Sequence, residues 1–113
     1  MIRLMQSPNP SGTETHPSNA PRCYRLHNIY PNPFYDRCCF AFDIPEETNC
    51  LFEIYDVSGR IIKTINNSTL KPGYYTMKWD GKDNHEEHVA SGVYFYRLKT
   101  KSFSMTKKIV YIQ

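Results

Sequence analysis

The sequence predicts an all-β fold, an antiparallel β-sandwich of about seven short strands. Runs of alternating apolar and polar residues recur along the chain, and turn-forming residues separate them at intervals of roughly 8 to 12 residues. No stretch of useful length has the periodicity of an amphipathic helix. Aromatic residues make up 14% of the chain, with 9 tyrosines, and flat rings cover the faces of short strands well. These features together favour a sandwich of the immunoglobulin-like type.

Length and charge limit the classes of protein that the chain can belong to. A chain of 113 residues can form one domain with a single core. Its net charge of +3 is a mild basic excess, weaker than the clustered charge of a nucleic-acid-binding domain, so no nucleic-acid partner is predicted. No window approaches the ~18 apolar residues of a membrane helix, and residues 1–5 are not followed by the apolar run of a signal peptide.

The chain divides into an N-terminal linker or tail, residues 1–22, and a globular domain, residues 23–113. The linker is rich in Ser, Asn, Thr and Pro and has almost nothing to bury, which indicates that the domain follows another module. Ordered structure is expected to begin near residues 24–34, where Pro31 and Pro33 hold the residues before them extended.

Strands are predicted where apolar residues recur at every second position, as Phe40, Phe42 and Ile44 do. The predicted strands span residues 39–44, 50–55, 60–65, 75–80, 93–98 and 103–112. The polar run 66–69 is predicted to end the third of them as a solvated loop.

The strand 93–98 is the strongest of these predictions. Tyr94, Tyr96 and Leu98 fall on one face, and Val93 and Phe95 make the other face apolar as well. A strand that is apolar on both faces is expected at the centre of its sheet and covered on both sides.

Turn signals separate the strands. Asp56 is placed to accept hydrogen bonds from the backbone after it, and Gly59 supplies a residue that tolerates positive φ. Pro72 and Gly73 occupy the two central positions of a predicted type II turn. The small residues 90–92 predict the turn that enters the strand 93–98.

The cysteines do not predict a metal site, because the chain contains no C-x-x-C pair. Cys38 and Cys39 are neighbours and point to opposite faces of a strand, so at most one of them belongs to the core. Structural thiols are favoured, and a disulfide among Cys23, Cys38, Cys39 and Cys50 stays open.

The loop of residues 80–88 gathers carboxylates and two imidazoles, and it is the best candidate for a metal or catalytic site. His85-Glu86-Glu87-His88 lacks the H-E-x-x-H spacing of zinc peptidases, and the acidic residues do not match a calcium loop. A solvated hairpin loop is favoured. The chain also lacks a G-x-S-x-G turn and a glycine-rich phosphate loop. We therefore expect no catalytic residues, no metal, no cofactor and no small-molecule substrate.

Basic residues gather on the last two strands and their connection, and they allow three interpretations. They are Arg97, Lys99, Lys101, Lys107 and Lys108. With the neighbouring aromatic residues they could form a stacking surface for a nucleic-acid single strand. The favoured structural role is protection of a sheet edge against edge-to-edge pairing. The third interpretation is recognition of a protein partner through this C-terminal edge.

Five motifs in order and spacing carry a family resemblance. They are Tyr30-Pro31-Asn32-Pro33-Phe34, residues 54–60, residues 70–81, residues 89–98 and Thr106-Lys107-Lys108-Ile109-Val110. From about Asn28 to Gln113 the chain resembles the C-terminal sorting domain of cargo proteins of the type IX (Por) secretion system. That family is related to the immunoglobulin-like domain of flagellar hook-capping proteins.

The resemblance implies a seven-stranded β-sandwich that acts as an address label of a longer exported precursor in Bacteroidetes-like bacteria. The cargo, an N-terminal domain not in this chain, would cross the periplasm and be secreted or held at the cell surface. The partners implied are an outer-membrane translocon component and a sortase-like peptidase that removes the domain. Recognition is expected at the C-terminal strand, with edge-strand addition as one mode.

The resemblance also assigns roles to particular residues. The partner-recognition residues it implies are Gly92, Tyr94, Lys107, Lys108, Ile109 and Val110. The residues of its structural motifs are Pro31, Asn32, Pro33, Asp56, Gly59, Pro72, Gly73, Tyr75, Trp79, Asp80 and Gly81. Two departures affect loops: Tyr35-Asp36 replaces a common Asn-Pro, and His85-Glu86-Glu87 replaces a loop that often contains Gly. The alternative function is an immunoglobulin-like structural or binding module, either hook-cap-like or a cell-surface domain that binds a polymer.

Overall fold

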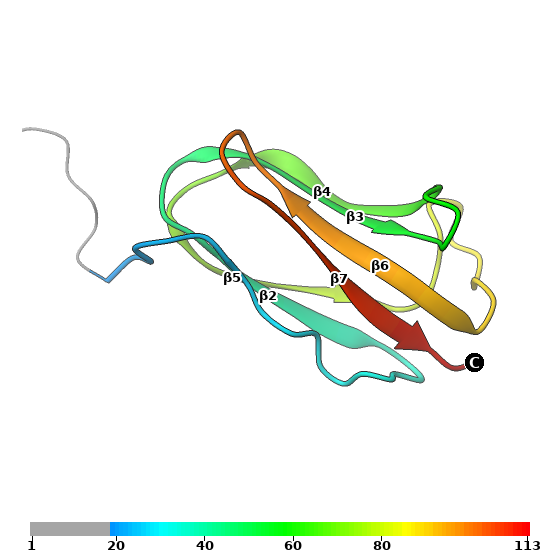
Figure 1. The fold of residues 1–113 in the computed structure, drawn as a ribbon. Helices are drawn as coiled ribbons and strands as arrows, with labels where there is room; N and C mark the ends of the chain where they lie inside the picture. The colour runs from blue at the N-terminus through cyan, green and yellow to red at the C-terminus, as the bar shows by residue number, and fades with distance from the viewer. Residues whose placement is uncertain (1–18) are drawn as a thin grey trace, which may run out of the picture.

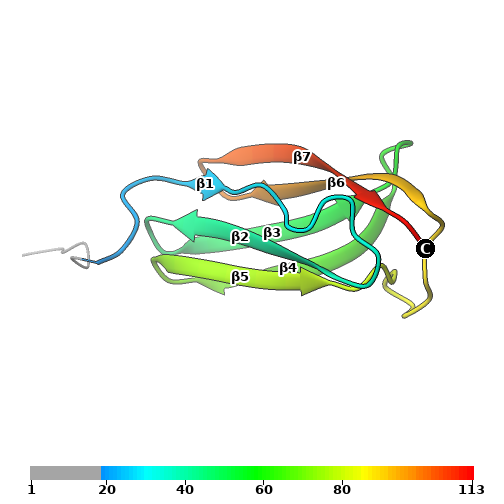
Figure 2. The same ribbon diagram turned by 90° about the horizontal axis from the view of Figure 1, so that it is seen from below.

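The domain is a sandwich of two antiparallel sheets that face each other (Figures 1 and 2). The computed structural model describes residues 19–113, so the predicted linker lies almost entirely outside the described residues. The three-stranded sheet has the order β1-β2-β5, with β1 (Arg25–Leu26), β2 (Cys38–Ile44) and β5 (Gly73–Trp79). The four-stranded sheet has the order β4-β3-β6-β7, with β3 (Thr48–Tyr55), β4 (Ile61–Leu70), β6 (Gly92–Lys99) and β7 (Ser104–Tyr111). The predicted all-β, immunoglobulin-like sandwich is confirmed.

The core lies between the two sheets and consists of the alternate residues that the strand patterns predict. Phe40, Phe42 and Ile44 of β2 are fully buried, as are Phe52 and Ile54 of β3. The Phe40 ring lies 4.7 Å from the Phe52 ring, measured between centroids, so aromatic contacts join the two sheets directly. Each such side chain stabilises the fold by about 1.5–3 kcal/mol through its removal from water.

The strand β6 is central in its sheet, as predicted, because it pairs with β3 on one side and β7 on the other. It is covered on one face only. Tyr94, Tyr96 and Leu98 are buried, whereas Val93 remains 38% exposed and Phe95 is half-buried. The expectation that β6 is covered on both sides is therefore wrong. The sandwich has only two layers, so the outer face of the four-stranded sheet meets solvent.

The polar run 66–69 is not a loop, which corrects a second prediction. These residues continue β4 to Leu70 and pair with the first half of β3. A register shift between Phe52 and Glu53 lets the two strands stay paired. The Asn66 side chain donates a hydrogen bond of 2.9 Å to the carbonyl oxygen of Cys50. β4 is an edge strand, and polar side chains are tolerated at an edge because one face and one side meet water.

The type II turn predicted at Pro72 and Gly73 is also absent. Positive φ at glycines occurs, among the described residues, at Gly59, Gly81 and Gly92, whereas a type II turn would require it at Gly73. Gly73 instead begins β5 and pairs with Ile44. Because β4 runs on to Leu70, only Lys71 and Pro72 connect β4 to β5. The Tyr75 hydroxyl donates to the Lys71 carbonyl oxygen at 2.6 Å.

Candidate partner-recognition site

The predicted recognition residues of β7 divide between the two faces of the strand. Ile109 is fully buried and belongs to the core. Lys108 is exposed and Val110 half-buried on the outer face, where they pair with Phe95 and Val93 of β6. Lys107 is half-buried on the inner side, and its Nζ donates to Asn28 Oδ1 at 2.9 Å. Lys108 is therefore the residue of this group whose charge is most open to a partner.

The other two predicted recognition residues lie at the start of β6. Gly92 begins the strand with a φ of 157°, and open space surrounds its Cα on the side where a Cβ would lie. The Tyr94 ring is 7% exposed and packs edge-on against Trp79 with 5.6 Å between centroids. Its hydroxyl donates to the Ala90 carbonyl oxygen at 2.6 Å, and burial raises its pKa. Tyr94 thus positions the turn and packs the core.

The free edge of β7 is half covered by the segment Asn32 to Phe34. The Asn32 side chain donates to the Lys108 carbonyl oxygen at 3.3 Å and accepts from the Val110 N–H at 3.1 Å. The Phe34 N–H donates to the Val110 carbonyl oxygen at 3.0 Å, and the Ile112 N–H donates to the Phe34 carbonyl oxygen at 2.9 Å. Beyond Lys108 the edge therefore has its hydrogen-bonding groups occupied.

The other half of the β7 edge is open. Backbone groups of every second residue on an antiparallel edge strand point away from the neighbouring strand. Val110 points its N–H and C=O away from β6, toward the Asn32 to Phe34 segment. Every second residue before it has the same orientation, so the N–H groups of Ser104, Thr106 and Lys108 also point outward, as do the C=O groups of Ser104 and Thr106. No other backbone segment among residues 19–113 pairs with this half of β7. We call Ser104, Thr106 and Lys108 the open edge.

Aromatic side chains from two of the motifs, Phe34 and Trp79, meet Tyr111 at the end of the sandwich where β7 finishes. Phe34 stacks on Tyr111 with 4.8 Å between ring centroids, and Trp79 lies 5.4 Å from Phe34. The Trp79 Nε1 donates to the Lys82 carbonyl oxygen at 2.8 Å, which fixes the loop after β5. A Cβ at Gly81 would lie 2.6 Å from Cζ of Tyr111, so this position requires glycine. The motif residues therefore hold one another and β7 in place.

The remaining motif residues stabilise turns. Asp56 Oδ1 accepts from the N–H of Ser58 at 2.9 Å and of Arg60 at 3.0 Å, and Gly59 has a φ of 89°. The Ser58 hydroxyl is the main cause of a lowered pKa at Asp56. Asp80 Oδ1 accepts from the Lys82 N–H at 3.2 Å. Pro31 and Pro33 flank Asn32 and follow cis peptide bonds.

The outer face of the four-stranded sheet carries a polar cluster that the strand patterns do not predict. Arg97 donates to the Tyr55 hydroxyl, which donates to Glu53, and Arg97 lies 3.6 Å from the Glu53 carboxylate. The Arg97 guanidinium also lies over the Tyr55 ring at 4.9 Å. Burial, with the Glu53 carboxylate, raises the pKa of Tyr55. Strand alternation places all three residues outward, but only the pairing of β3 with β6 brings them together.

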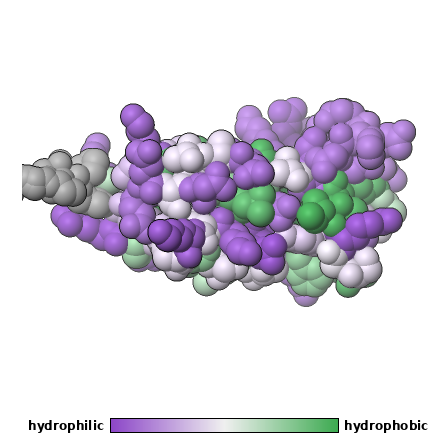
Figure 3. Space-filling model, turned by 90° about the horizontal axis from the view of Figure 1, so that it is seen from above, coloured by the Kyte–Doolittle hydropathy of each residue, from purple (hydrophilic) through white to green (hydrophobic). Residues whose placement is uncertain are grey.

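Apolar patches lie on this outer face among hydrophilic side chains (Figure 3). Val93 is 38% exposed and Ile61 is 48% exposed. Single exposed apolar residues are common on protein surfaces, so these patches alone do not define a binding site.

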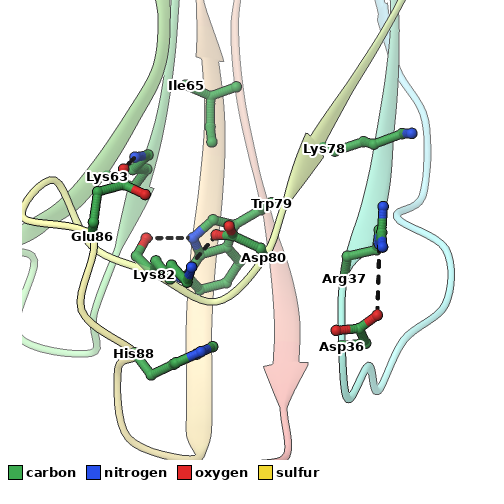
Figure 4. A pocket seen from close by; sticks show the side chains of 10 residues that line it. All are labelled: Asp36, Arg37, Lys63, Ile65, Lys78, Trp79, Asp80, Lys82, Glu86 and His88. Atoms are coloured by element: carbon green, nitrogen blue, oxygen red, sulfur yellow. Dashed lines mark hydrogen bonds and ion pairs between the residues drawn. The ribbon is translucent and has the colours of Figure 1, made fainter.

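The loop of residues 80–88 forms one side of a cleft of about 500 Å³ (Figure 4). Lys63 pairs with Glu86 at 2.9 Å, and Asp83 Oδ1 accepts from the N–H groups of His85 and Glu87. These backbone hydrogen bonds, with that of Glu87 the largest cause, lower the pKa of Asp83. Among residues 19–113 no group of three His, Cys, Asp or Glu side chains is arranged to hold a metal ion. The carboxylates of Asp80 and Asp83 thus hold the backbone of this loop, and that of Glu86 holds Lys63.

The cysteines are all free within the described residues. Cys38 and Cys50 are buried, Cys39 is half-buried and Cys23 is exposed. Burial, reinforced by the neighbouring Cys39, raises the pKa of the Cys38 thiol to about 12. The described residues also contain no helix that could cross a membrane.

Residues 19–113 form seven strands in two antiparallel sheets, and an aromatic cluster closes one end of the sandwich. These features place the domain in the class of immunoglobulin-like modules. The family model of the FlgD Ig-like domain matches residues 40–103, which is more than half of the chain. The protein therefore belongs to the family of FlgD Ig-like domains. A search of the curated proteins found no match.

Solved structures share the fold. Dimeric latent PorU from Porphyromonas gingivalis is similar over 77% of this chain and 9% of its own, with a TM-score of 0.64 and 23% identity. PorZ from the same organism, described as an essential bacterial surface component of the type-IX secretion system, is similar over 78% of this chain and 11% of its own, with a TM-score of 0.56 and 22% identity. FlgD from P. aeruginosa is similar over 66% of this chain and 59% of its own, with a TM-score of 0.52 and 24% identity. The chain thus corresponds to a small part of PorU and PorZ, and these likenesses concern the fold.

Proposed function

We propose that this domain is a non-catalytic sorting module of an exported bacterial protein, recognised at the outer-membrane translocon of the type IX secretion system. The observation that carries the proposal is the arrangement of β7. The strand presents the exposed Lys108 and the open edge, while Asn32 and Phe34 hold its C-terminal half in place. Open edges and fixed charges are features through which proteins recognise extended partners. The fold shared with PorU and PorZ supports the assignment to this secretion system.

The proposal gives the domain a partner and a location. The partner is a translocon component at the outer membrane, with a sortase-like peptidase acting afterwards on the junction to the cargo. The cargo would be released or displayed at the cell surface after passing through the periplasm. The recognition step needs no cofactor, because it depends on hydrogen bonds and charge at β7.

The experiment is an export assay in a type IX-competent host. Residues 23–113 are fused to the C-terminus of a reporter that has its own signal peptide, and the reporter is measured in the periplasm and in the medium. We expect export with the domain and periplasmic retention without it. Export should also fail in a strain that lacks the translocon. Periplasmic retention of a reporter that carries the folded domain would contradict the proposal.

Deleting residues 107–113 is a poor control in this assay. The deletion removes Ile109, which is fully buried, and Tyr111, which is 2% exposed. Loss of two such side chains would destabilise the domain by several kcal/mol, so a failure of export would report unfolding. Point substitutions at exposed positions avoid this problem.

The second candidate function is a structural or binding module that stays attached to its protein. The match to the FlgD Ig-like family and the Tyr55, Glu53 and Arg97 cluster favour it, since this cluster lies on a face that meets solvent. The export assay separates the two. A structural module would not change where the reporter accumulates.

A further inference from the structure

The open edge of β7 lies beside a groove that separates the edges of the two sheets. The groove has a volume of about 400 Å³ and is lined by residues 24–28 on one side and by Phe103, Met105 and Lys107 on the other. Tyr24 stacks on Phe103 at 5.0 Å and closes one end. The contact of Lys107 with Asn28 marks the other end. Figure 2 shows β1 and β7 side by side at this border of the sandwich.

The length of the open edge fits a short strand. From Ser104 to Lys108 the edge offers two carbonyl oxygens and three N–H groups that point away from β6. With a rise of about 3.4 Å per residue, a segment of about five residues would span it. The Asn32 side chain stops any longer pairing, because it already bonds the Lys108 carbonyl oxygen and the Val110 N–H.

The two sides of such an added strand would meet different surroundings. Side chains on its inner side would enter the groove, where Met105 is 41% exposed. Side chains on its outer side would lie next to Lys108, which is exposed, and the exposed Lys99 lies one strand further in, opposite Ser104. On the outer face the Glu53 carboxylate already pairs with Arg97, and Glu47 lines a cleft with Lys99. The outer side therefore favours acidic residues in the partner. The inner side favours apolar residues at the end of the groove that Phe103 and Met105 line, whereas polar side chains line the other end.

We propose that the open edge of β7 binds an extended segment of a partner protein in which acidic and apolar residues alternate, added as a fifth strand to the four-stranded sheet. A second copy of this chain is a poorer occupant, because its residues 104–108 contain two lysines and no carboxylate that could meet Lys108. This proposal rests on the proposed function for its cellular role. It adds to that function the edge that the partner binds and the chemistry of the partner segment.

The binding experiment uses the full chain labelled with 15N and a capped synthetic peptide that alternates Val and Glu over seven residues. The matched control peptide has Lys in place of Glu. We expect the acidic peptide to slow amide exchange at Ser104, Thr106 and Lys108 by about tenfold or more, and the basic peptide to have no effect. Protection at other strands, or equal effects of both peptides, would overturn the inference. Protection of these amides without any peptide would also overturn it, because the edge would already be occupied by this chain or a second copy.

Two substitutions at one exposed position separate backbone pairing from side-chain contact. Thr106→Pro removes the N–H that points away from β6. It breaks no hydrogen bond to β6, because Thr106 lies in a non-hydrogen-bonded pair with Arg97. Thr106→Val keeps that N–H and the branched shape. We expect T106P to weaken peptide binding about fivefold to tenfold and T106V to leave it within about twofold, with both proteins folded by their thermal unfolding. Unchanged binding by T106P would overturn the inference.

The export assay distinguishes a failure of this inference from a failure of the proposed function. If the domain is not a sorting module, the wild-type fusion stays in the periplasm. If the domain sorts cargo but is read elsewhere, the wild-type and T106P fusions are exported equally. The inference predicts that the T106P fusion alone is retained.

Discussion

The side-chain amide of Asn32 substitutes for a strand along the last part of β7, because it accepts from the Val110 N–H at 3.1 Å and donates to the Lys108 carbonyl oxygen at 3.3 Å. One side chain thereby makes the pair of hydrogen bonds that a neighbouring strand would make. This contact divides the β7 edge into a covered half and an open half. It also gives the Pro-Asn-Pro motif a structural purpose.

Asn32→Ala should destabilise the domain by about 1–2 kcal/mol, because two hydrogen bonds at the sheet edge are lost. Amide exchange at Val110 should become faster. Urea unfolding and hydrogen exchange measure the two effects. The control is Asn49→Ala, which removes one exposed side-chain hydrogen bond to Asn67 on the opposite edge and should change stability by less than about 0.5 kcal/mol. Equal effects of the two substitutions would show that Asn32 does not hold β7.

Gly81→Ala should destabilise the domain by about 2–4 kcal/mol, since the new Cβ would overlap the Tyr111 ring and the backbone has a φ of 77°. Gly59→Ala is the matched control. Its φ of 89° imposes a similar backbone strain, but no atom lies within 4 Å of the new Cβ. We expect about 1–2 kcal/mol for G59A, measured by urea unfolding. If both variants lose the same stability, the approach of Gly81 to Tyr111 is not a constraint on the fold.

The sequence patterns predicted most of the fold because burial on one face imposes a period of two. Phe40, Phe42 and Ile44 alternate clearly, and their strand appears where the pattern places it. The polar half of β4 could not be predicted, since an edge strand needs no apolar alternation and Asn66 is held by its own hydrogen bond to the partner strand. The wrong prediction of a type II turn followed from that error, because the position of the turn depends on where β4 ends.

The site was less predictable than the fold. The alternation of apolar residues predicts that Lys108 lies on a strand. The family resemblance implies that Lys108 takes part in partner recognition. Only the tertiary structure shows that Asn32, 76 residues earlier, covers the adjacent backbone and leaves Thr106 open. The Tyr55 and Arg97 contact likewise depends on which strands pair.

Stability should fall in acid partly through Asp56, whose pKa is lowered in the folded state by its hydrogen bonds with Ser58 and Arg60. The folded protein holds this proton less tightly than the unfolded chain does. The carboxylate therefore contributes stability above the unfolded pKa of about 4, and the contribution disappears as the pH falls through the lower folded value.

Asp56→Asn keeps one acceptor oxygen but removes the charge. The melting temperature of D56N should lie below that of the wild type at neutral pH, and the difference should shrink as the pH is lowered to about 3. Thermal unfolding between about pH 3 and pH 7 measures it. A difference that stays constant over this range would mean that the charge of Asp56 does not contribute.

The cysteines should differ sharply in reactivity toward iodoacetamide in the folded protein. Cys23 is exposed and should react first, and Cys39 is half-buried and should react more slowly. Cys38 has a pKa of about 12 and is buried, so its reactive thiolate is scarce and shielded at about pH 8. Mass spectrometry should find Cys38 and Cys50 modified only after unfolding. Rapid modification of Cys38 in the folded protein would contradict its place in the core.

The recognition of β7 through charge is tested most directly by the extracellular fraction of a reporter fused to this domain, compared between Lys108→Glu and Lys78→Glu. Both lysines are exposed strand residues, but Lys78 lies on β5 at the opposite edge of the sandwich. Recognition through the charge on β7 predicts that the K108E fusion is retained in the periplasm while the K78E fusion is exported like the wild type, with both domains folded. Equal export of all three fusions would contradict it.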